Sequence, residues 1–251
     1  MKKGFRILKF KKDKPIFEVK DISKSFDGRP ILKKLSVKVF PGECVGILGP
    51  NGCGKTTLFS MCIGEQSPEG GKIFLNNKSI EQIPIHLRAK EGLGYLPQQR
   101  SVFDMSVYDN ILGIAQISIK ETKNQKAITE KLLDEFNLQH LRRLNASVLS
   151  GGEIRRLMMV RIMINKPKIV LLDEPLAALD PLVIQDIQKY ILKIQAGGTA
   201  VMLTDHNVKN LFDITDRSYV LGEHTVIAEG TSRELLKSSK AIEHYFGSQF
   251  S

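Results

Sequence analysis

Residues 43–57 read ECVGILGPNGCGKTT, and they join an apolar run to a glycine-rich turn. The run at 44–48 has the length and composition of a buried strand in a parallel sheet. The turn after it fits the pattern G-x-x-x-x-G-K-[ST] at every fixed position. Glycines let successive backbone N–H groups point inward at phosphate oxygens, and the helix that starts after the turn directs its positive dipole end at the same anion. The stretch therefore predicts a site for a nucleoside triphosphate.

The residues of this turn have distinct predicted roles. We expect Lys55 to reach the β- and γ-phosphates and the Thr56 hydroxyl to ligate Mg²⁺. The other residues predicted to contact the nucleotide here are Gly49, Pro50, Asn51, Gly52, Cys53, Gly54 and Thr57. The alternative is a chance glycine turn before a helix. The strand before the turn and the amphipathic helix start after it argue against that alternative.

The composition is ordinary for a globular protein, but the positive charge is unevenly distributed. Of the 251 residues, 42% are hydrophobic and 25% are charged, and the formal net charge is +10. Residues 1–14 hold seven basic side chains and one acid, so they contribute +6 and the remaining residues only +4. We therefore predict a basic extension at 1–14 before a domain at 15–251. A solvated tail is the favoured interpretation of the extension, with binding to nucleic acid or to an anionic membrane surface as alternatives.

Three features predict a soluble protein of the cytosol. No apolar run approaches the roughly 18–20 residues that span a bilayer, and the basic N-terminus lacks the apolar segment of a signal peptide. The three cysteines, Cys44, Cys53 and Cys62, have no metal-ligand spacing and are predicted to be reduced thiols. Any role at a membrane is therefore expected to depend on partner proteins.

The rest of the first half alternates strands with helices. Residues 16–48 alternate apolar runs with turns, which predicts a small antiparallel sheet that leads into the strand at 44–48. Further strands are predicted at 70–77 and 92–98, and helical periodicity at 106–145 predicts an α-helical insertion over about 100–165. Phe26 is followed by Asp-Gly and is compatible both with stacking on a purine base and with the core of a hairpin.

Two later apolar runs end in ionisable side chains. Residues 168–174 read KIVLLDE and residues 200–206 read AVMLTDH. The carboxyl ends of parallel strands form one edge of a sheet, and this edge binds ligands in open α/β proteins. We predict that Asp173 holds Mg²⁺ through water, that Glu174 polarises the attacking water, and that His206 contacts the γ-phosphate. The alternative is that both acids are simply solvated at the surface. This alternative does not fit, because the strand that carries them is predicted to be buried.

A second glycine-rich turn, LSGGE at 149–153, opens another helix. The Ser150 hydroxyl and the N–H groups of Gly151 and Gly152 form a candidate second anion site. For these residues alone, a plain helix N-cap is the better interpretation. Asp180 precedes Pro181, which predicts that Asp180 caps a further amphipathic helix.

In this order, the elements resemble the nucleotide-binding subunits of ABC transporters over residues 16–236. The Walker A motif is at 49–56, the signature at 149–153 and the Walker B motif at 169–173, with Glu174 next. Gln98 matches the Q-loop glutamine, Asp180 the D-loop and His206 the switch histidine. The resemblance implies an α/β fold: a P-loop NTPase (RecA-like) core with a mainly parallel sheet, an N-terminal antiparallel β subdomain and an inserted α-helical signature subdomain.

The resemblance also implies the cofactors and the assembly. ATP and Mg²⁺ would bind between the subunits of a head-to-tail homodimer, with Walker A of one chain facing residues 150–152 of the other. Phe26 would stack on adenine, and Asp180 would lie at the nucleotide interface. Glu174, His206 and Gln98 would be catalytic, and Gln98 would join Thr56 and Asp173 as metal ligands.

A closer resemblance is to the ATPases of lipopolysaccharide exporters, carried by the segments 94–98, 106–110, 136–142, 204–208 and 245–250. It implies membrane permease subunits resembling LptF and LptG, a partner contact at Phe103, and a cytoplasmic location peripheral to the inner membrane. The chain departs from that family in three ways: residues 103–106 are one residue shorter, residues 157–163 are methionine-rich, and residues 1–14 have no counterpart.

Two other functions compete with lipopolysaccharide export. One is the ATPase of a branched-chain amino-acid importer, whose sequences are similar. The other is a soluble ABC ATPase that acts on nucleic acid. That class carries a long coiled-coil insertion or a second cassette. Lys55 and Ser150 are too close in sequence for such an insertion, and no cassette repeats. No direct nucleic-acid partner is therefore expected.

Overall fold

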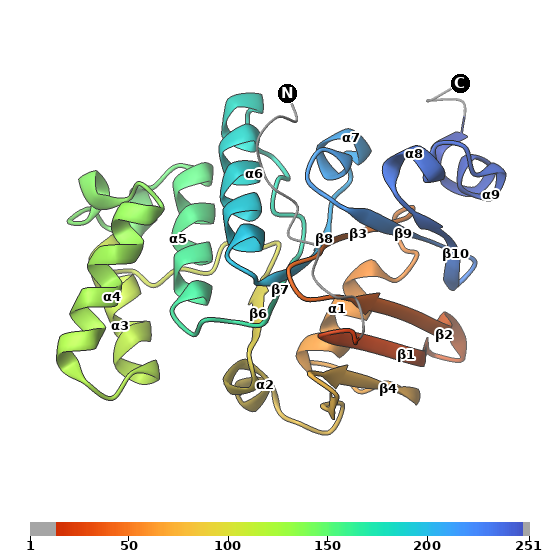
Figure 1. The fold of residues 1–251 in the computed structure, drawn as a ribbon, viewed down its shortest axis with the longest axis horizontal. Coiled ribbons are helices and arrows are strands. Elements are labelled where there is room, and N and C mark those ends of the chain that lie inside the picture. The colour runs from red at the N-terminus through yellow and green to blue at the C-terminus, as the bar shows by residue number, and fades with distance from the viewer. Residues whose placement is uncertain (1–13, 248–251) are drawn as a thin grey trace.

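The computed structural model describes residues 14–247, and two β-sheets organise them (Figure 1). The predicted basic extension lies outside the described residues except for Lys14, and so does Phe250 at the end of the C-terminal segment. Among the helices of this described part, none combines the length and the apolar character needed to cross a membrane.

The larger sheet has six strands in the order β10-β9-β3-β8-β7-β6. Their bounds are β3 Cys44–Leu48, β6 Leu93–Leu96, β7 Ile169–Leu172, β8 Ala200–Thr204, β9 Arg217–Gly222 and β10 Thr225–Gly230. Neighbouring strands pair in parallel from β9 to β6, while β10 is antiparallel to β9. The central strand β3 is buried along its whole length. The mainly parallel sheet predicted from the apolar runs is confirmed.

The two faces of this sheet belong to different hydrophobic cores. In β7, Ile169 and Leu171 pack with the helix α1 (Lys55–Ile63) and the smaller sheet. Val170 and Leu172 point the other way and pack with α5 (Gly151–Met163) and α6 (Pro181–Ala196). Alternate side chains of a strand point to opposite faces, so a strand covered on both sides reads as a continuous apolar run.

The smaller sheet is antiparallel, with strand order β2-β1-β4-β5. Its strands are β1 Phe17–Phe26, β2 Arg29–Val39, β4 Gly70–Leu75 and β5 Lys78–Ser79. The predicted antiparallel sheet is confirmed, and β4 joins it beside β1. Arg88, in the short helix α2 (Ile85–Glu91), is fully buried behind α1. Its guanidinium donates to the carbonyls of Met61 and Cys62 at 2.7 and 2.9 Å, so it satisfies the C-terminal end of α1.

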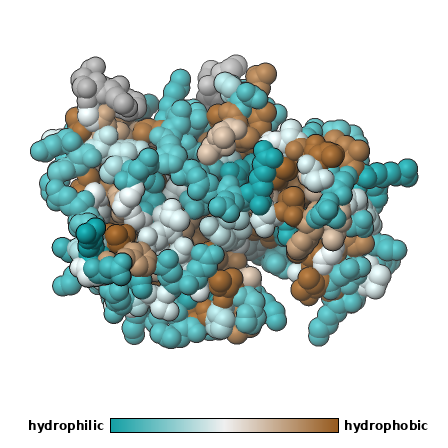
Figure 2. All heavy atoms as spheres, turned by 180° about the vertical axis from the view of Figure 1, so that it is seen from behind, coloured by the Kyte–Doolittle hydropathy of each residue, from teal (hydrophilic) through white to brown (hydrophobic). Residues whose placement is uncertain are grey.

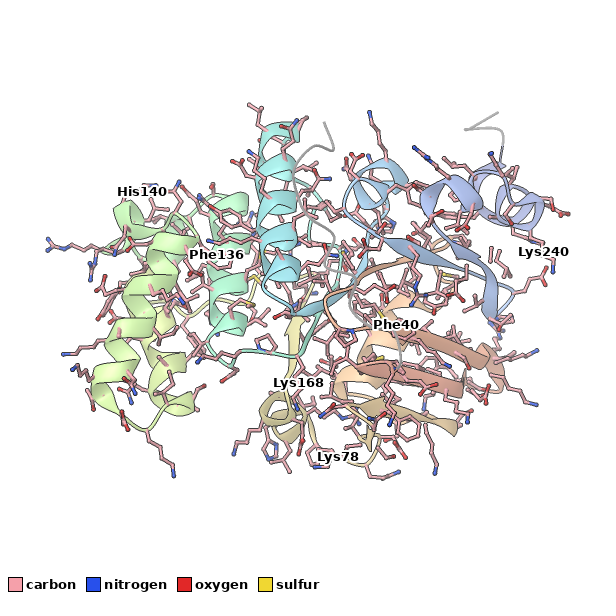
Figure 3. The ribbon with its side chains drawn as sticks, viewed as in Figure 1. Phe40, Lys78, Phe136, His140, Lys168 and Lys240 are labelled. Carbon is pink, nitrogen blue, oxygen red and sulfur yellow. The ribbon has the colours of Figure 1, made fainter. Side chains whose placement is uncertain are left out.

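Helices occupy the region of the predicted insertion, at the left of Figure 1. They are α3 Val107–Ser118, α4 Thr122–Glu135 and α5, with the short 3₁₀ turns η1 Gln139–Leu141 and η2 Ala146–Val148. Phe136, which is labelled in Figure 3, stacks on Tyr190 of α6 with ring centroids 5.0 Å apart. This contact joins the helical part to the layer that covers the larger sheet. The methionines Met158 and Met159 are buried in the same core.

The C-terminal segment packs beside the strand that precedes the phosphate loop. It contains α7 Val208–Phe212, α8 Ser232–Leu235, α9 Ser239–Ala241 and the π-helical turn η3 Ile242–Phe246. Phe246 shares a small core with Leu48 and Leu211. The end of β3 is thereby covered by α7 and by the turn η3 near the C-terminus.

Candidate functional site

The glycine-rich turn predicted to bind phosphate runs from the end of β3 to the start of α1. Gly49, Gly52 and Gly54 have φ values of 150°, 80° and 103°, which other residues rarely adopt. A Cβ on Gly49 would lie 2.7 Å from the Leu221 carbonyl oxygen, and one on Gly54 would lie 2.7 Å from Leu32 Cδ2. The loop therefore needs glycine both for its backbone conformation and for its close approach to β9 and β2.

Lys55 lies over this loop rather than in solvent. Its side chain is buried, and Nζ donates to the carbonyls of Gly49 at 2.6 Å and Pro50 at 3.0 Å. Thr56 and Asn51 are exposed, and Thr57 is half-buried. Cys53 is half-buried, and burial raises the pKa of its thiol although the Lys55 charge opposes this. The predicted residues thus form one loop with its cation in place.

The structure brings together the three residues predicted to be catalytic. Glu174 follows β7 with a positive φ of 48°, and its side chain is 8% exposed. Gln98, just beyond β6, donates from Nε2 to Glu174 Oε2 at 2.7 Å. His206, just beyond β8, has Nε2 at 2.5 Å from Glu174 Oε1. Gln98 beyond β6 and His206 beyond β8 therefore both reach the Glu174 carboxylate beyond β7, and the three side chains form one cluster.

Asp173 is fixed by a residue that sequence reasoning missed. Thr204 ends β8, is fully buried, and donates to Asp173 Oδ1 at 2.7 Å. The same hydroxyl accepts the N–H of Glu174 at 3.0 Å. Burial raises the pKa of Asp173, while the Thr204 hydrogen bond acts in the opposite direction. The sequence did place Thr204 directly before Asp205 and His206, which could have suggested that it lies at the site.

Arg155 is a second residue that sequence reasoning missed. It belongs to α5, is 8% exposed, and donates to the carbonyls of Pro97, Gln98 and Glu174 at 2.9, 3.0 and 3.3 Å. Burial lowers the pKa of this guanidinium. Its position two residues after the signature turn suggested that it lies near the site, but nothing in the sequence indicated which groups it contacts. Arg155 holds α5 against the strand ends that carry the cluster.

The candidate second anion site is a helix N-cap at which Ser150 is exposed. Ser150 and Glu153 form a capping box: Glu153 Oε2 accepts the Ser150 N–H at 2.8 Å and its hydroxyl at 2.7 Å. Gly152 lies so close to Val183 of α6 that a Cβ would be 2.4 Å from Cγ1. The predicted N-cap is confirmed. No hydrogen bond or ion pair within residues 14–247 joins this turn to the phosphate loop of the same chain.

Asp180 is the N-cap residue of α6, with Pro181 at the first helical position, as predicted. Its exposed side chain, however, makes no capping hydrogen bond. The prediction of the helix start is therefore right, and the implied side-chain cap is wrong. Pro181 reduces the need for a cap because it has no N–H at a position where the helix cannot pair one.

Both predicted aromatic contact residues lie at the surface. Phe26 ends β1, is 42% exposed, and has Lys24 Nζ 5.6 Å from its ring centroid. Phe103 is 46% exposed, and the Arg161 guanidinium carbon lies 4.3 Å from its ring centroid. The Asn110 side chain pairs with the Phe103 N–H and C=O, both at 2.9 Å. The interpretation of Phe26 as a hairpin core residue is therefore wrong, and Phe103 is not a core residue either.

Comparisons with known proteins show the family of the chain. The model of the ABC transporter family matches residues 32–177. The chain belongs to the ABC transporter family. The lipopolysaccharide export ATP-binding protein LptB of Haemophilus influenzae is 38% identical, over 94% of this chain and 98% of its own length. LptB of Escherichia coli K12 is 39% identical, over 92% of this chain and 97% of its own.

Solved structures agree with this membership. A nucleotide-free ATP-binding cassette from an ABC transporter is 26% identical, with a TM-score of 0.83 over 93% of this chain and 100% of its own. The ADP conformation of the cassette MJ1267 is 28% identical, with a TM-score of 0.81 over 93% and 99%. The predicted P-loop NTPase fold is confirmed. This ABC family member is an ATP-binding, ATP-hydrolysing subunit.

Proposed function

We propose that this chain is the ATPase subunit of a lipopolysaccharide exporter, located at the cytoplasmic face of the inner membrane. Its similarity to LptB from two organisms, over nearly the whole of each chain, supports the transported substrate and the location. The observation that supports ATP hydrolysis at this site is that Gln98 and His206 both contact the Glu174 carboxylate.

In this proposal, the phosphate loop binds the triphosphate of ATP. The buried Lys55 ammonium exchanges its contacts with the loop carbonyls for contacts with the β- and γ-phosphates. Gly54 is the N-cap of α1 and supplies no side-chain cap, and the first turn of α1 has no acid. The N–H groups and the positive dipole end of α1 are therefore available to an anion. Phe26, exposed at the end of its hairpin, stacks on adenine.

The oxygens beside the loop fit Mg²⁺. Asp173 offers a carboxylate, the exposed Thr56 a hydroxyl and Gln98 an amide oxygen. No group of three or more His, Cys, Asp or Glu side chains within residues 14–247 is arranged as a metal cage. Mg²⁺ does not need one, because it keeps several waters and binds through few carboxylates plus substrate phosphates. When bound, it would neutralise charge that develops on the phosphates.

Glu174 is the group that prepares water for attack. Its carboxylate accepts a hydrogen bond from water and aligns that water with the γ-phosphorus. Gln98 and His206 hold the two carboxylate oxygens from opposite sides, which fixes the direction of attack. Arg155 holds the backbones of Gln98 and Glu174 together and ties them to α5, which helps the cluster to keep its geometry.

A second copy of the chain completes each site in a head-to-tail dimer. Ser150 is exposed at the start of α5, Gly151 is half-buried and Gly152 is buried. In the part of the chain that the structure describes, no hydrogen bond or ion pair joins this turn to the phosphate loop of the same chain. Asp180 is exposed at the start of the neighbouring helix α6. We infer that both helix starts face the nucleotide of the partner subunit.

The permease contacts the side of the molecule that carries the helical part. Figure 2 shows hydrophobic residues gathered over the region of α3 to α5, which lies on the right in that view. Exposed apolar side chains of this region include Phe103, Met105, Leu144 and Val148. A polar cavity of about 510 Å³ lies beside them, lined by Ser106, Tyr108, Asp109, Arg142 and Arg143. An apolar anchor beside a polar cavity suits a short helix of an LptF- or LptG-like subunit.

Two measurements test the proposal. Glu174→Gln should bind ATP but lower kcat by roughly 10²–10⁴, because an amide cannot orient and polarise water as a carboxylate does. Wild-type turnover in this variant would overturn the role of Glu174. The tagged chain, extracted in detergent from membranes of its own cells, should co-purify with LptF- or LptG-like proteins. Recovery of branched-chain amino-acid permease subunits instead would overturn the lipopolysaccharide assignment.

A further inference from the structure

Asp205 is a buried carboxylate beside the cluster, and one of its oxygens is unpaired. It directly follows β8, and its side chain is 3% exposed. Oδ1 accepts the N–H of Asn207 at 2.8 Å, whereas Oδ2 has no hydrogen-bond partner. The Leu176 backbone N–H lies near enough to lower the pKa of this carboxyl, but no hydrogen bond to Oδ2 is formed. A buried acceptor without a partner destabilises a fold, so native proteins rarely retain one.

Asp205 lies beside the cluster formed by Gln98, Glu174 and His206. Glu174 and His206 both act on its charge, and Arg155 and the Tyr245 phenol lie within electrostatic range of it. Burial and the Glu174 charge raise the pKa of Asp205, while the Asn207 N–H acts against them. Asp205 therefore stands where the ends of β7 and β8 meet the C-terminal segment.

The turn after β8 does not by itself require a carboxylate at this position. An asparagine would supply the same Oδ1 acceptor to the Asn207 N–H, since Asn and Asp form such turns equally well. Asn207 in turn caps α7 by accepting the Asn210 N–H at 3.1 Å. What asparagine cannot supply is the second acceptor, which is the oxygen that the fold leaves unpaired.

We propose that Asp205 is a positioning residue for ATP hydrolysis, with one oxygen for the turn and one for water. Oδ1 fixes the turn that presents His206 to Glu174. Oδ2 accepts a hydrogen bond from a water molecule held beside the Glu174–His206 pair. This water restrains the pair without touching the nucleotide. The inference rests on the proposed role of Glu174, and it adds to that role a residue that acts only through others.

The test is Asp205→Asn, which keeps the turn acceptor and replaces the second acceptor with a donor. We expect kcat for ATP to fall about 10- to 100-fold, as for the loss of a hydrogen bond to a charged group. KM for ATP and the Kd of a fluorescent ATP analogue should stay within about twofold, because no nucleotide contact changes. The melting temperature should stay close to that of the wild type, because the variant keeps the acceptor that the Asn207 N–H uses in the turn.

Asp213→Asn is the matched control. Asp213 lies at the exposed C-terminal end of α7 and carries the same chemical change away from the cluster. Its kcat, KM and melting temperature should equal those of the wild type. A control that loses activity with Asp205→Asn would show a general effect of charge in this segment and would overturn the inference.

Three further outcomes would overturn it. Wild-type kcat in Asp205→Asn would mean that only the turn uses this side chain. A lower melting temperature with a raised KM would show a role in folding. An equal loss of kcat in Tyr245→Phe with an unchanged Kd for the ATP analogue would make the phenol, and not water, the donor to Oδ2; the Kd reports on the contact of this phenol with the Gly49 backbone. These outcomes leave the proposed function in place as long as Glu174→Gln abolishes turnover, so the two failures are distinguishable.

Discussion

The helices α1 and α5 both begin after a glycine-rich turn, but their first turns are different. Gly54 precedes α1 with no side-chain cap, and no acid lies in the first turn. Ser150 precedes α5 inside a capping box, and Glu153 occupies both its N–H and its hydroxyl. Lys55 at the first helix is buried, whereas Ser150 at the second is exposed. The start of α1 is therefore free of a side-chain cap, whereas the start of α5 is already occupied by Glu153 of the same chain.

Ser150→Arg should have the largest effect in this comparison. The substituted side chain blocks the turn that faces the partner's nucleotide, so we expect ATP hydrolysis and ATP-driven dimerisation to be lost. ATP binding to the monomer should remain, because the phosphate loop is untouched. Steady-state ATPase, size-exclusion chromatography and a nucleotide-binding titration measure the three properties. Dimerisation that survives Ser150→Arg would contradict the head-to-tail arrangement.

Lys55→Ala should instead weaken ATP binding to the monomer. Losing a charge-assisted contact to phosphate corresponds to about 10- to 100-fold in Kd. An unchanged Kd would contradict the role of the phosphate loop. Mixing Lys55→Ala with Ser150→Arg gives a mixed dimer that has one site with both defects and one with neither. We expect partial recovery of ATPase in the mixture, and no recovery would mean that a single intact site is not sufficient.

The same contrast explains what could be predicted from the sequence. The phosphate loop, the strands that end in Asp173 and Glu174, and the position of His206 follow local patterns, and these elements are where we expected them. Thr204 and Arg155 were missed because their hydrogen-bond partners lie about twenty to sixty residues away along the sequence. The periodicity of hydrophobic residues within one element cannot predict such contacts. The implied side-chain cap at Asp180 failed because Pro181 already suits the first helical position.

Phe103→Ala tests the exposed apolar surface around Phe103, which lies outside both helix starts and is the proposed contact with the permease. The ring lies against the Arg161 guanidinium and outside the hydrophobic cores, so its loss should not alter the melting temperature or the basal ATPase of the isolated subunit. Co-purification with the membrane partner should be lost, as for an interface anchor. Leu192→Ala is the control, because Leu192 is similarly exposed, at 41%, on α6. An intact complex together with a lower melting temperature would return Phe103 to a role in folding.

Glu153→Gln should have the smallest effect, and it addresses the difference between the two helix starts directly. The carboxylate of Glu153 interacts with the Ser150 N–H and hydroxyl and with the positive end of α5. Removing its charge should lower the free energy of unfolding by about 0.3–1 kcal/mol at pH 7. It should also strengthen ATP-driven dimerisation, because a negative charge no longer competes with the partner's phosphates for the same helix start.

The stability difference between Glu153→Gln and the wild type should depend on pH in a definite direction. The Ser150 hydrogen bonds, first among several contacts, lower the pKa of Glu153 in the folded chain. Its contribution to stability is therefore present above the pKa of the unfolded chain and is lost as pH falls through the folded value. Urea unfolding should show the variant less stable than the wild type at pH 7 and equal to it at acid pH. Equal stability at pH 7, or weaker dimerisation of the variant, would mean that the capping box does not compete with the anion and that the two helix starts differ only in exposure.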